Sequence, residues 1–90
     1  MIYIDNFEWD DKNREHISYK KVQDFEVEEV LLFDKPIYLK GRENKYYAYG
    51  VTESGRYLFI VFVTRGNATI RVITARDMEK KEKAYYKKRR

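Results

Sequence analysis

The 90-residue sequence predicts an α+β domain with two N-terminal helices, an antiparallel sheet of about four strands and a C-terminal helix. Residues 57–63 are an unbroken run of aromatic and branched aliphatic side chains, which is typical of a strand buried on both faces. Gly66 and Asn67 then favour a tight turn before a second β-prone run at 69–76, so the two runs predict a hairpin. The chain before residue 34 and after residue 77 favours helices instead.

A short apolar segment opens the sequence. Residues 2–4, followed by Phe7 and Trp9, favour a short edge strand or an apolar segment that packs under the core. We expect the role of this segment to be structural.

The first helix is expected to begin at Asp10 or Asp11, either of which can cap it, and to run to about residue 20. Four of its residues share one face through their spacing: Asn13, His16, Ile17 and Lys20. Only Ile17 among them is apolar, so the helix either packs lightly or turns a polar edge toward a site. On that edge, His16 is either a hydrogen-bonded packing residue or a catalytic group.

A second helix is expected over residues 25–33, where apolar residues recur at helical spacing: Val27, Val30 and Leu31. Three glutamates point outward from it: Glu26, Glu28 and Glu29. Neighbouring helix positions point about 100° apart and nothing nearby supplies further ligands, so we expect a solvated face or a contact for a basic partner rather than a cation site. Pro36 favours an end of the helix just before it.

From there the sequence is β-prone, and it closes with a third helix. Further strands are expected at 37–40 and 46–52, with turns at 41–44 and 53–55. Asp77 can cap a helix over 78–86, in which Glu79 and Lys83 are in the favourable i, i+4 order. Tyr85 is expected to pack this helix against the sheet, although its hydroxyl could reach a ligand.

The net charge of +4 is unevenly distributed. Residues 1–34 contain 4 basic and 10 acidic side chains, residues 35–76 contain 8 and 2, and residues 77–90 contain 7 and 3. This asymmetry is expected when one face of a protein meets a polyanion. The alternative is that lysine and glutamate simply keep a small domain in solution, above all in the tail at 87–90.

Composition excludes several classes of protein. The chain has no cysteine, and therefore no disulfide framework or thiolate zinc site, and its single histidine disfavours a catalytic zinc. We therefore expect no metal and no cofactor. The sequence also shows no glycine-rich phosphate loop, nucleophile elbow or helix-turn-helix signature. A basic region followed by an apolar stretch is missing from the N-terminus, which favours a cytoplasmic location without a membrane anchor.

Four arginines lie on the predicted hairpin without an acidic residue between the first and the last: Arg56, Arg65, Arg71 and Arg76. Arginine meets phosphate oxygens with two parallel hydrogen bonds and stays charged, which suggests an anion-binding surface. Together with tyrosines and one histidine, such a surface permits metal-free cleavage of RNA, which needs a base, an acid and cations around the phosphate. Tyrosines could stack unpaired bases.

Nearly the whole chain, from Phe7 to Tyr86, resembles the BrnT family of small ribonuclease toxins, which are similar in fold to RelE-type toxins. The resemblance lies in FEWDDKNREHI, EVEEVLLFDKP, YYAYGVTESGRYLFIVFVTRG and IRVITARDMEKKEKAYY. It implies a single domain over residues 1–86 with a basic tail at 87–90, RNA cleavage that arrests translation, and neutralisation by a ribbon-helix-helix antitoxin of the BrnA type encoded beside the toxin.

The resemblance also implies site residues. Arg71 and Arg76 are expected to hold the scissile phosphate, while His16 or Glu82 transfers protons. The resemblance implies RNA binding for Arg56, Arg65 and Tyr85. Lys20 and Lys45 are expected to bind RNA as further basic residues, not through the resemblance.

The chain departs from the family pattern at several positions. Lys20 and Lys21 replace a common His-Gly pair, Val51 replaces a frequent polar or basic residue, and Lys83 replaces the usual arginine. If the missing histidine served as the base, the chain would be either a weak toxin or a domain without the activity. The alternative function is therefore a non-catalytic module that binds RNA or protein and keeps the antitoxin surface.

Overall fold

The computed structural model describes residues 3–89 and confirms the α+β class and the order of the expected elements. Its helices and strands are, in chain order, β1 (Asn6–Phe7), α1 (Asp11–Ser18), α2 (Asp24–Leu32), β2 (Ile37–Lys40), β3 (Lys45–Val51), β4 (Tyr57–Gly66), β5 (Thr69–Asp77) and α3 (Lys80–Arg89). None of the helices in residues 3–89 is long and apolar enough to span a membrane.

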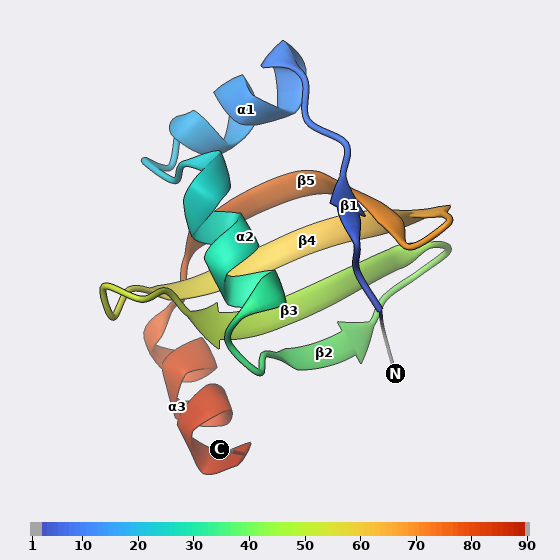
Figure 1. Ribbon diagram of the computed structural model, residues 1–90. Coiled ribbons are helices and arrows are strands. Elements are labelled where there is room, and N and C mark those ends of the chain that lie inside the picture. Colours follow the sequence, from blue (N-terminus) through green and yellow to red (C-terminus); the bar gives the residue numbers. More distant parts are fainter. Residues whose placement is uncertain (1–2, 90) are drawn as a thin grey trace.

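The sheet has five strands in the order β1-β5-β4-β3-β2, rather than about four (Figure 1). Strands β2 to β5 form the expected antiparallel ladder, whereas β1 adds a short parallel edge in which Asn6 pairs with Thr69 and Phe7 with Ile70. Two residues are too few for an alternating pattern, so the edge strand or apolar segment was expected at residues 2–4 with Phe7 and Trp9, whereas the strand is Asn6–Phe7 and residue 2 lies outside the described residues. Because β1 stops at Phe7, the rest of β5 has no neighbouring strand on that side within residues 3–89.

The hairpin of β4 and β5 contains two irregularities. Its loop residues Asn67 and Ala68 have φ angles of 53° and 57°, the positive values that a tight two-residue turn requires. Val61 pairs with Thr74 but Phe62 pairs with Val72, so Ile73 is an extra residue in a β-bulge. The partners of Arg71 and Arg76 on β4 are Val63 and Phe59, four residues apart, and both arginines therefore lie on the same face of the sheet.

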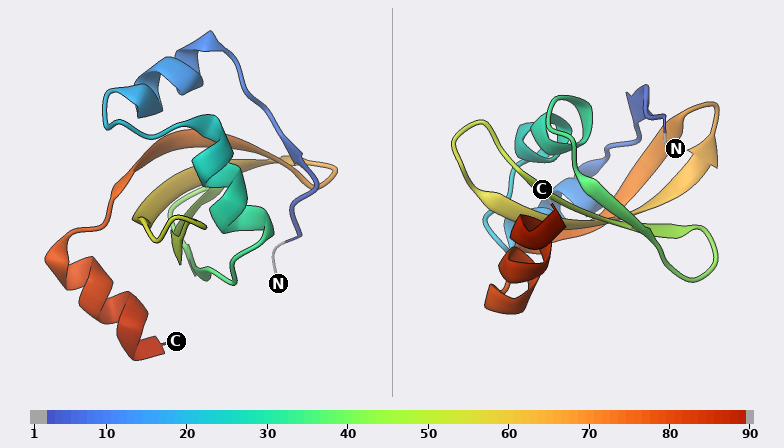
Figure 2. Two further views of the ribbon diagram at one scale, coloured as in Figure 1. Left: turned by 60° about the vertical axis from the view of Figure 1, so that its left-hand side comes forward. Right: turned by 90° about the horizontal axis from the view of Figure 1, so that it is seen from below.

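The helices divide between the two faces of the sheet. Figure 2 shows α1 and α2 on one side, while α3 lies on the other side and covers only one end of it. Val30 of α2 approaches so closely that a Cβ atom added to Gly50 would lie 2.5 Å from its Cγ1. Glycine at this position lets the helix approach the backbone of β3 closely.

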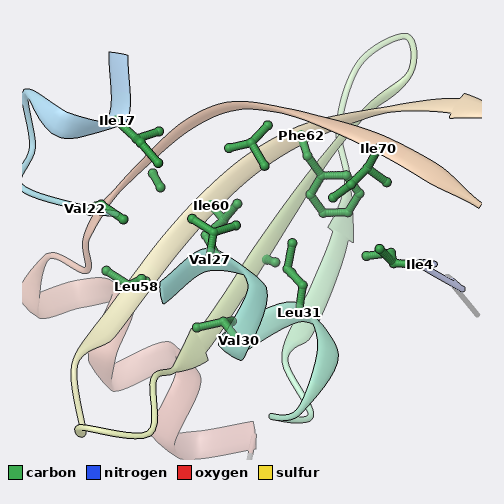
Figure 3. Packing of buried hydrophobic residues seen from close by; sticks show 13 residues of the cluster. Ile4, Ile17, Val22, Val27, Val30, Leu31, Leu58, Ile60, Phe62 and Ile70 are labelled. Atoms are coloured by element: carbon green, nitrogen blue, oxygen red, sulfur yellow. The ribbon is translucent and has the colours of Figure 1, made fainter. Parts of the chain in front are cut away.

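The hydrophobic core lies between the sheet and the first two helices (Figure 3). On β4, Leu58, Ile60 and Phe62 are fully buried, whereas the alternate residues are only partly buried. The expectation of a strand buried on both faces was therefore wrong, because α3 covers only part of the second face. From the helices, Ile17, Val27 and other aliphatic side chains complete the core.

The ends of α1 and α3 differ from expectation. Asp10 caps α1 as expected, but the helix ends at Ser18, two residues early. Asp77 does not cap α3, because it is the last residue of β5 and its carboxylate accepts hydrogen bonds from Arg56 instead. Helix α3 begins at Lys80 and continues to Arg89, so it includes Lys87 of the expected tail.

Candidate functional site

Three of the four hairpin arginines bind a carboxylate at the N-terminus of a helix. Asp10 caps α1 and accepts hydrogen bonds from Arg71. Glu26 completes the capping box of α2 and accepts from Arg56. Glu82 in the first turn of α3 accepts from both the Glu79 N–H and Arg76. The anions that these arginines bind in the folded protein are thus its own carboxylates.

Arg56 is surrounded by acceptors. Its three guanidinium nitrogens donate to the carboxylates of Glu26 and Asp77 and to the backbone carbonyls of Lys20 and Lys21, at 2.6 to 3.3 Å. The hydrogen bonds that Arg56 donates to Asp77 raise the pKa of Arg56 and lower the pKa of Asp77. This arginine joins the loop after α1, the start of α2 and the end of β5. Lys20 contributes its carbonyl, while the residue itself is exposed.

Arg76 lies among groups from three elements. It donates two hydrogen bonds to Glu82 at 2.8 and 2.9 Å, and its guanidinium carbon lies 4.5 Å from the centre of the Phe59 ring. The hydrogen bond from Arg76 lowers the pKa of Glu82 and raises its own pKa. Tyr85 packs nearby with its ring 5.2 Å from that of Tyr49. The structure therefore brings three expected site residues, Arg76, Glu82 and Tyr85, to the same end of the sheet.

Arg71 lies at the other end of the same face. Its Nη1 donates to Glu8 and Asp10 at 3.2 and 2.9 Å, and its Nη2 donates to Asp10 at 3.2 Å. The Arg71 guanidinium, with help from the Asn13 N–H, lowers the pKa of Asp10 from 3.8 to about 2. Arg71 is thus held in place from its Nη side, while its Nε has no hydrogen-bond partner within residues 3–89.

His16 and Arg71 line the same open hollow between α1 and β5, together with Lys12, Asn13, Val72 and Ile73. The hollow has a volume of about 280 Å³. It exists because β1 stops short and α1 lies along the exposed edge of β5 (Figure 1). The amide of Asn13 donates to the carbonyls of Glu8 and Val72 and fixes α1 to this edge.

The polar groups of the hollow have few internal partners. Lys12 and His16 are one helical turn apart and therefore lie on the same side of α1. Within residues 3–89, their side chains make no hydrogen bond or ion pair, and His16 has only an edge contact with the ring of Tyr19. The hollow thus combines an available imidazole and ammonium with a guanidinium fixed by carboxylates.

The face of the sheet opposite α2 continues from Arg71 as an aromatic and basic surface. Lys45 pairs with Val63, which pairs with Arg71, so the two cations lie in one row across the sheet. The partly buried ring of Tyr47 lies between this row and the row of Arg76, and its centre is 5.7 Å from that of Phe59, the partner of Arg76 on β4. We call this region the open sheet face.

The expected catalytic residues form two groups rather than one. Arg71 and Arg76 are separated by about 13 Å along the strand, since their partners on β4 are four residues apart. His16 joins Arg71, and Glu82 joins Arg76. Arg65 lies at the turn, where Thr64 pairs with Ile70 and Gly66 with Thr69 so that Arg65 is itself an extra residue, and it contacts Glu8 at 3.3 Å. No group of three or more His, Asp or Glu side chains suited to a metal ion occurs within residues 3–89.

Sequence reasoning missed Lys12 and the carboxylates that hold Arg71. Lys12 had a detectable signal, because it precedes His16 by four residues on the same helix. Glu8 had none, since its contact with Arg71 spans 63 positions and depends on the parallel pairing of β1.

A family model described as the ribonuclease toxin, BrnT, of type II toxin-antitoxin systems matches residues 9–82. The chain belongs to the BrnT family. Membership implies a toxin with ribonuclease activity, RNA as its substrate and an antitoxin as its partner. The match contains both groups, from His16 and Arg71 to Arg76 and Glu82. A search of curated proteins found no match.

The structure gives a physical reason for one departure from the BrnT pattern. Lys21 occupies the place of a common glycine and has a φ of 60°, a conformation that glycine adopts without strain. The N–H of Val51 donates to Asp34, and the Lys83 ammonium lies 5.5 Å from the centre of the Tyr57 ring. The side chains of Val51 and Lys83 thus lie outside the hollow between α1 and β5.

Proposed function

We propose that this BrnT toxin cleaves RNA without a metal ion at the hollow between α1 and β5, and thereby arrests translation in the cytoplasm. The observation that carries the proposal is the meeting of His16 and Arg71, from distant parts of the chain, in one open hollow. An imidazole beside fixed cations supplies the groups that cleavage by the ribose 2′-hydroxyl requires.

His16 is the proposed proton-transfer group. As base, its neutral imidazole takes the proton of the 2′-hydroxyl while the 2′-oxygen forms a bond to phosphorus and the bond from phosphorus to the 5′-oxygen breaks. The products are a 2′,3′-cyclic phosphate and a 5′-hydroxyl, whose proton comes from a general acid. Lys12 is well placed for that second role, because it lies one turn from His16 on the same side of the helix.

Arg71 is the proposed partner of the phosphate. Charge develops on the non-bridging oxygens during the reaction, and a fixed guanidinium stabilises it without reorganising. Glu8 and Asp10 hold the Nη side of Arg71, so the Nε edge is the one offered to the substrate. The two carboxylates position the arginine but also offset part of its charge, which leaves Lys12 as the uncompensated cation of the hollow.

The open sheet face is the proposed path of the RNA strand. Lys45 lies in the row of Arg71, and Arg76, Glu82 and Tyr85 form the far end. Rings such as those of Tyr47 and Phe59 can stack unpaired bases, at about 1 to 3 kcal/mol per base.

In this arrangement Arg76 and Glu82 bind and orient the strand rather than cleave it. Arg65, expected to guide RNA, contributes positive charge at the margin, whereas the charge of Arg56 is offset by Glu26 and Asp77.

The likeness to RelE-type toxins and neutralisation by a ribbon-helix-helix antitoxin of the BrnA type remain part of this proposal. They are supported by the family and by the α+β order of elements.

The test is to incubate the purified protein with total RNA in EDTA, with and without ribosomes, and to analyse the fragments and their ends. Wild-type protein should produce fragments with 5′-hydroxyl ends, which polynucleotide kinase labels without prior phosphatase treatment. His16→Ala should lower the rate by 10² or more, and Lys12→Ala by a smaller factor. Arg42→Ala, in the turn before β3, is the matched control and should cleave normally.

Two results would contradict the proposal. Undiminished cleavage by the His16→Ala variant would remove the hollow as the catalytic site. Intact RNA with and without ribosomes would favour the non-catalytic binding module.

A further inference from the structure

We infer that the outer face of α2 is the docking surface for a basic, apolar segment of the antitoxin. This face consists of Phe25, Glu28, Glu29 and Leu32, together with Phe33 just after the helix. The inference rests on the assignment as a toxin of a toxin-antitoxin pair and is independent of the catalytic mechanism.

Helix α2 is apolar on two sides, which a helix that only covers a sheet does not need to be. Its inner side buries Val27, Val30 and Leu31 against the sheet. Phe25 and Leu32 are seven residues apart and therefore lie on one line of the opposite side, where they are 51% and 43% exposed. Phe33, the residue directly after Leu32, is 74% exposed. Exposed apolar side chains gathered in this way are characteristic of a surface for a partner protein.

The charge of this face selects a basic partner. Glu28 accepts a hydrogen bond from the Trp9 indole, and Glu29 accepts one from the Glu53 N–H, so both are held by neutral donors. Neither forms an ion pair within residues 3–89, in contrast to the neighbouring Glu26, which is paired with Arg56. Two fixed negative charges thus flank the apolar line without internal compensation. Such a surface attracts lysine and arginine and repels RNA.

A hollow beside the face can receive one basic side chain. It has a volume of about 230 Å³ and is lined by Glu29, Phe33, Asp34, Val51, Thr52 and Glu53. The apolar groups suit the aliphatic stem of a lysine or arginine, and the glutamates suit its charged end.

This surface lies away from the proposed RNA path, so the antitoxin and RNA contact different sides of the toxin. The outer face of α2 and the open sheet face lie on opposite sides of the sheet (Figure 2). An antitoxin anchored on α2 therefore gains affinity without competing with RNA for the same arginines. Inhibition then requires a second part of the antitoxin to reach the hollow or the open sheet face.

The test measures binding of the purified antitoxin encoded beside the toxin gene, by isothermal titration calorimetry at two salt concentrations. Phe25→Ser/Leu32→Ser and Glu28→Lys/Glu29→Lys should each weaken binding at least tenfold. Glu28→Gln/Glu29→Gln keeps side chains that can accept the observed hydrogen bonds, and should also weaken binding while reducing its salt dependence. Leu39→Ser and Glu43→Lys, on β2 and the following turn, are the matched controls and should bind normally.

Circular dichroism establishes that each variant is folded, and the RNA gel assay records cleavage separately. Cleavage should be unchanged in all of the α2 variants, because they leave the hollow between α1 and β5 intact. Affinities within twofold of wild type for both the apolar and the glutamine variants would overturn the inference. A toxin that binds the antitoxin through α2 but cleaves no RNA would support this inference and contradict the proposed catalytic site instead.

Discussion

Arg76 and Glu82 form a two-pronged ion pair that joins the end of β5 to the first turn of α3, with hydrogen bonds of 2.8 and 2.9 Å. The same carboxylate accepts the Glu79 N–H, so one side chain both caps the helix and attaches it to the sheet. Arg71 with Asp10, and Arg56 with Glu26, repeat the arrangement at the other two helices. The hairpin arginines therefore attach the N-terminus of each helix in the described chain to the sheet.

Replacing Glu82 by glutamine should lower the free energy of unfolding by about 1 to 2 kcal/mol at neutral pH, because a charge-assisted pair with Arg76 is lost. The pKa of Glu82 is lowered in the folded protein, so its contribution is complete above the ordinary value of 4.5 and disappears as the pH falls below it. Urea unfolding at pH 7 and pH 3 measures both effects. Glu79→Gln is the matched control, and an equal loss in that variant would refute the role of the pair.

The carboxyl group of Asp10 should titrate at about 2 in the folded protein, compared with 3.8 in an unperturbed chain. Between these values the unfolded chain binds more protons, so the protein loses stability as the pH falls through this window. In Arg71→Ala the pKa should rise toward 3.8, because Arg71 is the largest cause of the shift. NMR titration of the carboxyl carbon provides the measurement. An unchanged pKa in the variant would assign the shift to the helix N-terminus alone.

Arg56→Lys should destabilise the fold by about 2 kcal/mol, although the charge is kept. An ammonium group cannot reproduce the planar fork that contacts Glu26, Asp77 and two carbonyls together. Arg65→Lys is the control, because Arg65 has a single contact of 3.3 Å and a half-exposed side chain. Denaturant unfolding of the two variants compares them directly. Equal midpoints would show that Arg56 does not connect the elements as described.

Lys21→Gly should stabilise the protein by up to about 1 kcal/mol, because Lys21 holds a φ of 60° that costs a side-chain-bearing residue energy. Lys20→Gly should have the opposite sign, since Lys20 has no positive φ and glycine adds freedom to the unfolded chain. Thermal unfolding of both variants is the measurement, and a loss of stability in Lys21→Gly would contradict the account.

Sequence patterns predicted the parts of the fold that depend on neighbouring residues. The strands, the turn at Asn67 and the cap at Asp10 follow from alternation, backbone preference and side-chain hydrogen bonding within a few positions. The wrong cap at Asp77 shows the limit of such reasoning, because that carboxylate binds Arg56, 21 residues away.

For the candidate site, the sequence predicted which residue types take part but not which of them lie together. Arg71 and Arg76 were expected to share one phosphate, whereas the structure places them in separate groups. Their carboxylate partners, Glu8, Asp10 and Glu82, all lie outside the hairpin, so its sequence gives no sign of them. The hollow itself depends on how far β1 extends along β5, which two strand residues cannot specify locally.

The extra residue Ile73 determines which side chains of β5 point to each face of the sheet. In a regular strand, residues an odd number apart point to opposite faces, and Arg71 and Arg76 would do so. One inserted residue shifts the phase of the strand, turning both arginines outward while Val72 and Ala75 remain in the core. Deleting Ile73 would force a choice between burying a guanidinium and exposing the aliphatic side chains. A single bulge thus allows one strand to serve both the interior of the molecule and its basic surface.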